Sequence, residues 1–337
     1  MNVLIQSYNT CIQNQAGGVQ HRIRKTVSAL REKGVSAEYF NQFESNVALC
    51  DILHVFGYTC ENLGLIRCAK AYGKKVVISP VAPLINGRKI DFYRMLSHFP
   101  IQTTYKLLIQ SIQLADLVIV ETKKEADFIR KHYRIPLERI EIIPNGAEEI
   151  TVADESVFDA IGKKCKYILH VGRFDENKNQ INVIKAMRKT NIDVVFAGGA
   201  SHMDLKYYDL CKKEAEGYAN FHFLGWLDAD SPLLRSAYAN ADTFVMPSYY
   251  ETFGLVIVEA GIAGAKLALS STLPILDYEA FKDCKTFNPA DITEMRECIM
   301  EVINMPANAT LANRIKHDFS WKAVAQKHIE CYEGLLK

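Results

Sequence analysis

Residues 243–260 read TFVMPSYYETFGLVIVEA: a short apolar run, a polar loop and a longer apolar run. The β-branched and aromatic residues at 243–246 predict a buried strand. Pro247 ends this strand and Gly254 favours the start of a helix, which would carry Glu259 in its second turn. The stretch therefore predicts one strand–loop–helix unit, the building block of a parallel sheet covered by helices.

Two carboxylates, Glu251 and Glu259, flank the predicted helix N-terminus, which attracts anions through its free N–H groups and its dipole. A ligand with phosphates between two hydroxyl-bearing ends, such as a nucleotide-sugar, would suit this arrangement. Alternatively, Glu251 is a solvated loop residue and Glu259 is a carboxylate favoured by the dipole. Glu259 counts against this alternative, because its neighbours are apolar and a buried carboxylate needs a partner.

The same alternation of short apolar runs and longer amphipathic stretches extends along the chain in two series. It predicts an α/β protein with two doubly wound domains, and the polar segment 148–155 that follows Pro144-Asn145-Gly146 marks the boundary. A helix from Val19 is expected to end at Gly34. The predicted strands are 3–5, 52–55, 76–78, 117–120 and 142–143 in the first series, and 167–171, 194–197, 243–246 and 266–269 in the second.

A second group of polar residues follows the predicted strand 167–171. Its sequence, GRFDENK (172–178), places Arg173 and Lys178 on one strand-to-helix loop. In an open parallel sheet, ligands bind beyond the carboxyl ends of the strands, so these cations are well placed for a diphosphate. Two solvated loop cations are the simpler alternative, and the sheet edge shared with Glu251 favours the site.

Gly17 and Gly18 precede the helix predicted from Val19. Glycines there would allow close backbone approach to an anion at the helix N-terminus, although a simple turn is the alternative. The pattern is neither GxxxxGK[ST] nor GxGxxG. Motifs therefore support neither a nucleoside-triphosphate hydrolase nor a dinucleotide-binding protein.

The composition is that of a folded globular protein, with 337 residues of which 49% are hydrophobic and 23% charged. Lys and Arg number 40 against 39 Asp and Glu, a balance that argues against a dedicated nucleic-acid binder. The charge is uneven, since residues 1–150 hold 19 basic and 14 acidic side chains. Nine scattered cysteines without a C-x-x-C pair suggest reduced thiols rather than a zinc site or disulfide framework, and no transmembrane helix is expected.

Taken in order and spacing, a set of short motifs resembles the retaining glycosyltransferases of family 4, which carry a Glu-x7-Glu element like that of Glu251 and Glu259. The resemblance implies the GT-B fold, in which two Rossmann-like domains face each other across a cleft and a C-terminal helix crosses back to the N-terminal domain. It implies an acceptor-binding domain at 1–148, completed by the helix at about 319–337, and a donor-binding domain at 149–318. The other motifs lie at 51–55, 115–120, 143–146, 171–178, 223–225 and 241–248.

By position, the resemblance implies three catalytic residues. Arg173 and Lys178 would bind the donor diphosphate, and Glu251 would contact the transferred sugar. Glu259 would accept hydrogen bonds from the ribose hydroxyls. The other implied donor-binding residues are Gly17, Gly18, Gly172, Gly225, Trp226, Thr252, Phe253, Gly254 and Leu255, with Gly225 and Trp226 near the nucleobase.

The sequence departs from the family at one place. Many relatives carry a histidine at the end of the strand matching 76–78, where Ser79 and Pro80 stand here, so that role has no residue assigned to it. His54, on the preceding strand, is expected to be a core residue rather than a site residue. His170, inside an apolar strand, is also expected in the core.

The implied activity is transfer of a sugar from a UDP-, GDP- or other nucleotide-diphosphate-sugar to a hydroxyl of a glycan or lipid-linked glycan, with retention of anomeric configuration. No cofactor and no metal are expected, because the D-x-D letters at 228–230 follow Gly225-Trp226 in an expected turn or helix cap. Two alternatives stay open: a nucleotide-sugar epimerase of the GT-B type, and a catalytically silent subunit that binds sugar nucleotides or glycans.

A cytoplasmic protein of polysaccharide biosynthesis is expected, with peripheral association at the inner face of an anionic membrane. The observation behind this expectation is the basic excess of the first half, since basic clusters bind anionic lipids. Two such clusters are Arg67, Lys70, Lys74 and Lys75, and Lys123, Lys124, Arg130, Lys131 and Arg134.

Overall fold

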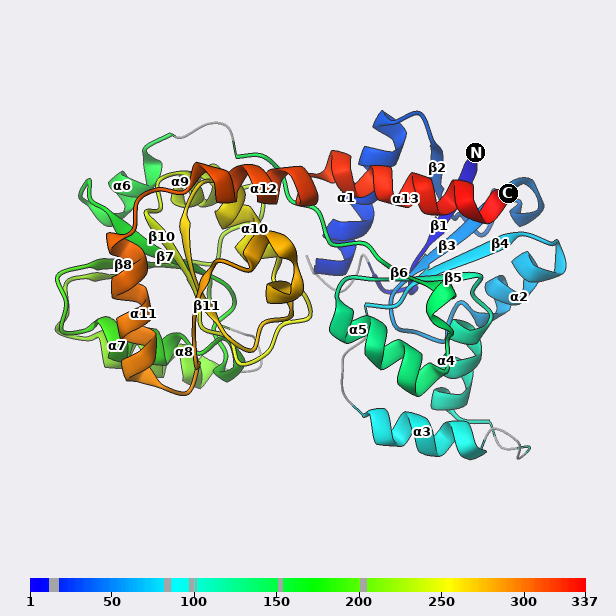
Figure 1. Cartoon of the computed structure of the whole chain (residues 1–337), viewed down its shortest axis with the longest axis horizontal. Coiled ribbons are helices and arrows are strands. Elements are labelled where there is room, and N and C mark those ends of the chain that lie inside the picture. The colour runs from blue at the N-terminus through cyan, green and yellow to red at the C-terminus, as the bar shows by residue number, and fades with distance from the viewer. Residues whose placement is uncertain (12–17, 82–85, 97–99, 101, 151–153, 201–204) are drawn as a thin grey trace. The chain divides into compact units, whose positions relative to one another are not determined.

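The computed structural model describes residues 1–11, 18–81, 86–96, 100, 102–150, 154–200 and 205–337. The chain divides into two units (Figure 1). Unit 1 consists of Met1–Gly146 together with Trp321–Lys337, and unit 2 consists of Ala147–Ser320. Within the described residues, no helix is long and apolar enough to cross a membrane.

Unit 1 is built on a parallel six-stranded sheet with the order β2-β1-β3-β4-β5-β6 (Figure 1). Its strands are β1 (Asn2–Gln6), β2 (Ser36–Tyr39), β3 (Ile52–Phe56), β4 (Lys75–Ser79), β5 (Leu117–Val120) and β6 (Ile140–Ile142). Its helices are α1 (Gly18–Glu32), α2 (Leu63–Ala71), α3 (Gly87–Met95), α4 (Thr104–Gln113), α5 (Lys123–Phe128) and α13 (Trp321–Leu336), with short turns η1 (Val47–Leu49), η3 (Ile129–Tyr133) and η4 (Leu137–Arg139).

Each face of this sheet has its own core, because successive side chains of a strand point to opposite faces. Val3 and Ile5 of β1 pack with residues of α1 and α13, whereas Leu4 packs with residues of α2, α4 and α5. Burial on both faces explains why the central strands read as continuous apolar runs rather than alternating ones.

Unit 2 repeats this architecture with the strand order β12-β11-β10-β7-β8-β9, again all parallel. Its strands are β7 (Tyr167–Val171), β8 (Asp193–Ala197), β9 (Phe221–Gly225), β10 (Thr243–Met246), β11 (Lys266–Ser270) and β12 (Lys285–Phe287). Its helices are α6 (Ser156–Ile161), α7 (Gln180–Met187), α8 (Leu205–Ala215), α9 (Pro232–Ala239), α10 (Leu255–Ile262), α11 (Ile292–Asn304) and α12 (Ala309–Phe319), with short turns η5 (Glu176–Lys178), η6 (Pro274–Asp277) and η7 (Glu279–Phe281).

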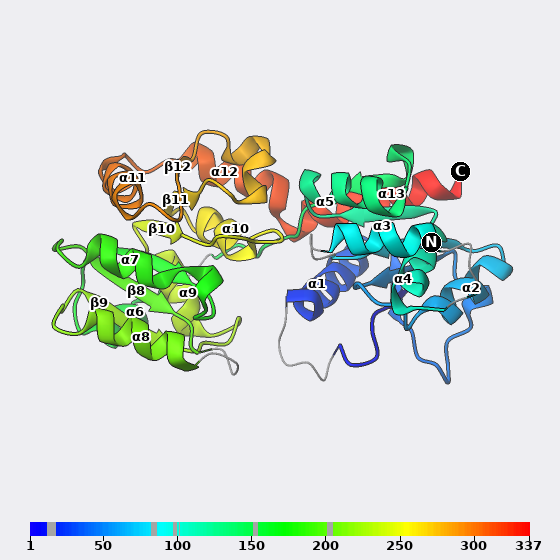
Figure 2. The same ribbon diagram turned by 90° about the horizontal axis from the view of Figure 1, so that it is seen from below.

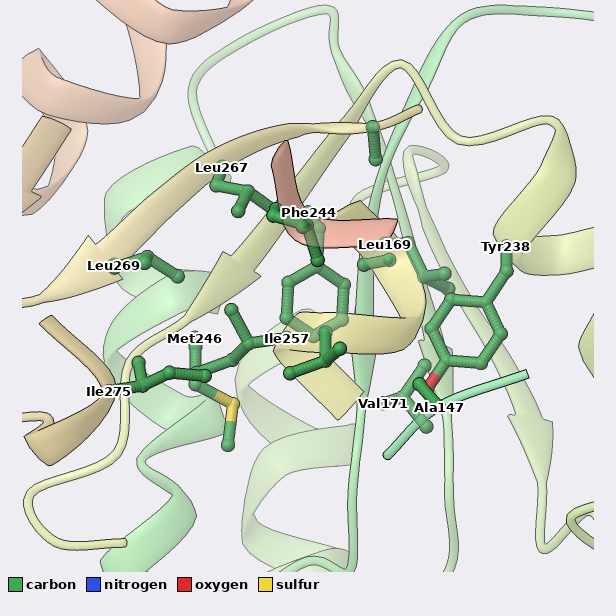
Figure 3. Close-up of a cluster of buried hydrophobic side chains, with 14 of the residues drawn as sticks. Ala147, Leu169, Val171, Tyr238, Phe244, Met246, Ile257, Leu267, Leu269 and Ile275 are labelled. Atoms are coloured by element: carbon green, nitrogen blue, oxygen red, sulfur yellow. The ribbon is translucent and has the colours of Figure 1, made fainter. Parts of the chain in front are cut away.

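Phe244 of β10 lies inside one of the two cores of unit 2. Figure 3 shows its ring among side chains of β7, β11 and α10, which include Leu169, Leu267 and Ile257. The opposite face packs against α7, α8 and α11 through residues such as Val183 and Ile299. Apolar contact on both faces holds β7 and β10 rigidly side by side, and these two strands position the site described below.

The strand order of unit 2 reverses between β7 and β10. From β7 the chain proceeds outward to β8 and β9 on one side, and it then returns to β10, β11 and β12 on the other side. In open α/β sheets, ligands bind beyond the carboxyl ends of the strands at such a reversal. The loops that follow β7 and β10, residues 172–179 and 247–254, therefore lie at the expected binding edge of unit 2.

Helix α13 completes unit 1 and packs against α1. The hydroxyl of Tyr332 on α13 lies 2.7 Å from Nδ1 of His54 on β3, and Oγ of Ser79 lies 2.8 Å from Nε2 of the same ring. His54 is fully buried, which confirms that it is a core residue. Ser79, which stands where many relatives were expected to carry a histidine, is also fully buried and orients His54.

All nine predicted strands are present, and three further strands, β2, β9 and β12, were not predicted. These three are edge strands of their sheets, and each has a single buried residue. An edge strand with so little burial lacks the apolar run that marks a central strand. The C-terminal helix begins at Trp321 rather than at about 319, because Phe319 ends α12 and packs in a core of unit 2.

Two fully buried histidines make unit 1 sensitive to acid. Burial lowers the pKa of His54 well below its ordinary value, and it lowers the pKa of His328 on α13 to about 4. Below pH 6.5 the unfolded chain binds these protons and the folded chain does not. The free energy of unfolding should therefore fall by ~1.4 kcal/mol per pH unit for each histidine as the pH drops from about 6.5 toward 4.

Replacing His328 by leucine should remove one of these two contributions. In a Trp226→Phe background, Trp321 is the remaining tryptophan of the chain, so its fluorescence reports on unit 1. Urea unfolding between pH 7.5 and 5 should give a free energy that falls about half as steeply in His328→Leu as in the background protein. Equal slopes in the two proteins would contradict the assignment.

Candidate functional site

The loops after β7 and β10 are tied together by their backbones and asparagine side chains. The Tyr249 N–H donates to the carbonyl oxygen of Asn177 at 2.9 Å, and Nδ2 of Asn177 donates to the carbonyl oxygen of Tyr250 at 2.8 Å. Asn179, held in the left-handed region at φ 57°, donates from Nδ2 to the carbonyl oxygen of Pro247 at 3.1 Å. These three bonds fix one loop against the other.

The side chains that sequence singled out on these loops form an ion pair. Nζ of Lys178 lies 2.5 Å from Oε1 of Glu251, and the two side chains are 18% and 12% exposed. A charge this shielded from water interacts more strongly with its partner than an exposed one does. The pair sits at the carboxyl ends of β7 and β10, where the strand order reverses.

Asp175 organises the two cations of the first loop. Its Oδ1 accepts the backbone N–H of Lys178 at 2.9 Å, capping η5, and its Oδ2 accepts from Nε of Arg173 at 2.9 Å. Arg173 is exposed and reaches toward solvent, whereas Lys178 turns in to Glu251. The loop thus presents one exposed cation and one largely buried cation at the same sheet edge.

Glu259 finds its partner on the neighbouring helix. The Tyr238 hydroxyl on α9 donates to Oε2 of Glu259 on α10 at 2.7 Å. Burial raises the pKa of Glu259 to about 7, although this hydrogen bond opposes the shift, and burial raises the pKa of Tyr238 well above its usual value. Near neutral pH, Glu259 is therefore partly protonated, whereas ordinary glutamates are ionised.

Glycines let the ends of β7 and β8 approach each other closely. A Cβ placed on Gly198, at φ 149°, would lie 1.9 Å from the carbonyl oxygen of Gly172. A pocket of about 120 Å³ opens at this place, lined by Gly172, Gly198 and Trp226 among others. The pocket adjoins Arg173, so the loop after β7 and Trp226, which was predicted near a nucleobase, border one cavity.

The remaining predicted site residues fall into different places. Gly254 is the left-handed cap of α10 at φ 100°, Leu255 begins that helix, and Thr252 is exposed beside Glu251. Phe253 is only 2% exposed and belongs to a core of unit 2, so its backbone alone can face a ligand. Gly18 begins α1 in unit 1, and Gly17 lies outside the described residues.

The D-x-D letters form a turn, as expected. The backbone N–H of Ser231 donates to the carbonyl oxygen of Asp228, and Asp230 lies 3.5 Å from Arg235. Across the described ranges of the chain, no group of three or more His, Cys, Asp or Glu side chains is arranged to hold a metal ion.

Several residues of this site escaped the sequence analysis. Asp175 could have been found from the sequence, because aspartate is a preferred N-cap residue and Asp175 immediately precedes the short turn η5. Tyr238 had none, since it lies 21 residues from Glu259 on a separate helix. Gln180 is fully buried and donates from Nε2 to the carbonyl oxygen of Arg173 at 2.9 Å and to His170 at 3.1 Å, and a buried glutamine at the start of a helix gives no pattern.

Comparison with known families separates the two units. The model described as "Glycosyl transferases group 1" matches residues 154–316, and the model described as "Glycosyltransferase Family 4" matches residues 42–149. The chain belongs to glycosyltransferase family 4. The resemblance read from the short motifs is thereby confirmed.

Two curated relatives illustrate the spread of family 4. The uncharacterized glycosyltransferase MJ1607 of Methanocaldococcus jannaschii is 31% identical over 169 residues, which are 46% of this chain and 42% of the relative. The mannosylfructose-phosphate synthase of Agrobacterium fabrum is 23% identical over 270 residues, 73% of this chain and 58% of the relative. The matched segments span about half the length of these relatives.

Several solved structures share the architecture of this chain. Sucrose-phosphate synthase of Thermosynechococcus elongatus superposes with a TM-score of 0.75 at 16% identity, covering 99% of each chain. The HepE protein of Anabaena, solved in complex with UDP, gives a TM-score of 0.73 at 15% identity and covers 99% of this chain and 100% of its own. Together with the two Rossmann-like units, these matches establish the GT-B fold that the sequence predicted.

The close approach at Gly198 should tolerate no side chain. Gly198→Ala places Cβ against the Gly172 carbonyl, so β7 and β8 must separate at their carboxyl ends, whereas Gly217→Ala adds a Cβ with nothing within 4 Å at a similarly positive φ of 82°. We expect the control to lose ~1 kcal/mol of unfolding free energy from backbone strain alone and Gly198→Ala to lose about 3 kcal/mol or more. Chemical denaturation measures both, and equal losses would show that the two loop ends are not held together.

Proposed function

We propose that the chain transfers a sugar from a nucleotide-diphosphate-sugar to an acceptor hydroxyl with retention of anomeric configuration. The observation that carries the proposal is the Lys178–Glu251 pair at the reversal between β7 and β10. A cation and a carboxylate held side by side match a donor whose diphosphate and sugar are adjacent. UDP, which is bound in the HepE structure, and the other nucleoside diphosphates are the donors to test first.

In this proposal, Lys178 and Arg173 stabilise the charge that develops on the departing diphosphate. The ammonium group of Lys178 leaves Glu251 and binds a phosphate oxygen. Glu251 then accepts hydrogen bonds from hydroxyl groups of the sugar. Because negative charge grows on the leaving group as the glycosidic bond breaks, both cations bind the transition state better than the donor. Arg173, anchored only through Asp175, has the freedom to follow the phosphate.

The amino end of α10 adds to this stabilisation. Gly254 caps the helix in a left-handed conformation, so the first N–H groups of α10 lie next to Glu251 and favour an anion. With two cations and a helix terminus to neutralise the diphosphate, the transfer requires no metal ion. We infer a front-face reaction, in which the leaving phosphate takes the acceptor proton, because the family resemblance implies it and Glu251 is assigned to the sugar hydroxyls.

Glu259 has the proposed role of holding the ribose. Its side chain is fixed by the hydrogen bond from Tyr238 and lies one turn inside α10. Its carboxylate oxygens can therefore accept hydrogen bonds from both ribose hydroxyls. The pocket at Gly172, Gly198 and Trp226 would receive the base. These assignments place the donor along one edge of unit 2, from the base at Trp226 to the sugar at Glu251.

The proposed acceptor is a glycan or a lipid-linked glycan, which places the enzyme in polysaccharide biosynthesis at the inner face of a membrane. An epimerase would need side chains that move protons, and the two core histidines give this alternative no support. His54 and His170 are both fully buried and hydrogen-bonded within the cores of their units, and burial lowers the pKa of each.

Removal of Lys178 should abolish most activity while the fold survives. Lys178→Ala is expected to slow hydrolysis of the preferred donor about 100- to 1000-fold, the usual effect of losing one preorganised group at a developing charge. The nucleotide of the donor is identified first, as the nucleoside diphosphate that most raises the melting temperature of the protein. A ligand that binds the folded state stabilises that state. Lys285→Ala, which breaks an ion pair with Glu301 at the opposite end of the strands, is the matched control.

Near-normal turnover in Lys178→Ala, with the control also normal, would overturn the proposed function. Glu251→Gln separates the two partners of the pair, because it keeps the shape of the side chain. It should lose hydrolysis and retain nucleotide binding, as expected of a group that contacts the sugar rather than the phosphates. Loss of nucleotide binding in this variant would assign Glu251 to the diphosphate instead.

Nucleotide binding should depend on pH through Glu259. Its pKa of about 7 means that the carboxyl is half protonated at neutral pH. In the proposed role, the ionised form accepts hydrogen bonds from both ribose hydroxyls. Affinity should therefore weaken about tenfold between pH 8 and pH 6, with proton release on binding. In Glu259→Gln this dependence should disappear, apart from the titration of the nucleotide's own phosphate, whose second pKa is about 6. Calorimetry at the two pH values measures both, and equal slopes would remove Glu259 from the ribose.

A further inference from the structure

The outer face of helix α3 in unit 1 combines basic and apolar side chains. Arg88, Lys89, Phe92 and Met95 are all exposed, with Phe92 at 51% and Met95 at 64%. Residues 88, 92 and 95 are spaced by four and three positions, so they form one stripe along the helix. The other side of α3 is occupied, since Ile90 is buried and the ring of Tyr93 stacks on Tyr105 of α4 at 4.8 Å.

Helix α3 is fixed beside the basic segment α5–η3. Nδ1 of His132 on η3 lies 2.9 Å from Oδ2 of Asp91 on α3, and the same ring lies so close to Gly87 that an added Cβ would be 2.6 Å from it. Figure 2 shows α3 running alongside α5. The segment α5–η3 carries exposed basic residues along its length: Lys123, Lys124, Arg130, Lys131 and Arg134. We call these five residues, with the four on α3, the α3–η3 surface.

The basic excess of the first half of the chain lies entirely here. Segments 87–96 and 123–134 hold eight of the 19 basic residues and three of the 14 acidic residues of positions 1–150, so the rest of that half is balanced at 11 of each. Each of the three acidic residues is either paired or buried. Asp91 is paired with His132 and Arg94, Glu125 is buried, and Asp127 lies 3.5 Å from Arg130. The other predicted cluster is weaker, because Lys70 is paired with Asp116 at 2.6 Å.

We propose that the α3–η3 surface docks onto an anionic lipid bilayer, with Phe92 and Met95 entering the boundary between headgroups and acyl chains. A soluble polyanion would need the cations alone and would leave both apolar side chains in water. A bilayer uses both, because basic residues bind its headgroups and exposed apolar residues insert below them. The inference rests on the proposed function only in that a lipid-linked acceptor would give the docking its purpose.

Vesicle sedimentation with the full chain tests this surface. We expect binding to phosphatidylcholine vesicles containing 30% phosphatidylglycerol, loss of binding on vesicles of phosphatidylcholine alone, and weakening in high salt. Arg88→Gln/Lys89→Gln should reduce partitioning at least tenfold, since each basic residue near such a surface contributes about fivefold. The matched control Arg67→Gln/Lys75→Gln removes two charges from the other cluster and should bind like the wild type.

The apolar contribution has its own pair of variants. Phe92→Ser/Met95→Ser keeps every charge and should also lose most binding, whereas Phe43→Ser removes an aromatic ring that is 88% exposed elsewhere in unit 1 and should bind normally. Normal binding by Phe92→Ser/Met95→Ser, or equal loss in the two charge variants, would overturn the proposal. Vesicle binding that survives in Phe92→Ser/Met95→Ser and is competed away by a soluble polyanion would overturn it in favour of a polysaccharide site.

Donor hydrolysis without vesicles separates this proposal from the proposed function. The α3 variants lie in unit 1, outside the residues assigned to the donor, and should hydrolyse donor at the wild-type rate. A wild-type protein that hydrolyses donor but ignores anionic vesicles would overturn the docking surface and leave the function standing. A protein that binds vesicles through α3 but hydrolyses no donor would do the reverse.

Discussion

The candidate site depends on the contact between two loops whose paired residues, Lys178 and Glu251, are 73 residues apart in sequence. Asn177 and Asn179 bind the backbone after β10, and this places Lys178 against Glu251. Neither side chain could be held with so little exposure if the loops were free, because the ordering of two long side chains costs conformational entropy. The loops are in turn held because β7 and β10 are neighbours in the sheet, buried on both faces. Local chemistry at the site is thus a consequence of strand order.

The central strands could be predicted from the sequence, whereas three of the four edge strands could not. Strands buried on both faces are continuous apolar runs, and eight of the nine predicted strands are central ones. The ninth, β6, is an edge strand that was recognised by the turn residues after it. The edge strands β2 and β12 are short and mostly exposed, so SAEY and KTF carry no apolar pattern. Their pairing is imposed by the neighbouring strand, which is tertiary information that a local window does not contain.

Within the site, the sequence revealed residues that directly follow a recognisable strand. It missed contacts between residues that are distant in the sequence. Lys178 and Glu251 were found because each follows a recognisable strand, but their ion pair was not foreseen. A carboxylate at 259 among apolar neighbours clearly needed a partner, yet nothing marked Tyr238 as that partner. The basic surface at α3 was also only half visible, since the charges of 123–134 stood out in the sequence and the exposure of Phe92 and Met95 did not.

The return of α13 to unit 1 makes that unit discontinuous, with unit 2 inserted between Gly146 and Trp321. The two ends of the insert meet, because the backbone N–H of Ala147 donates to the carbonyl oxygen of Phe319. During synthesis, unit 2 is therefore complete before His54 meets Tyr332, and the core between β1, α1 and α13 closes last. Unit 2 is one continuous stretch of the chain, whereas unit 1 needs α13, which follows unit 2, to complete its core.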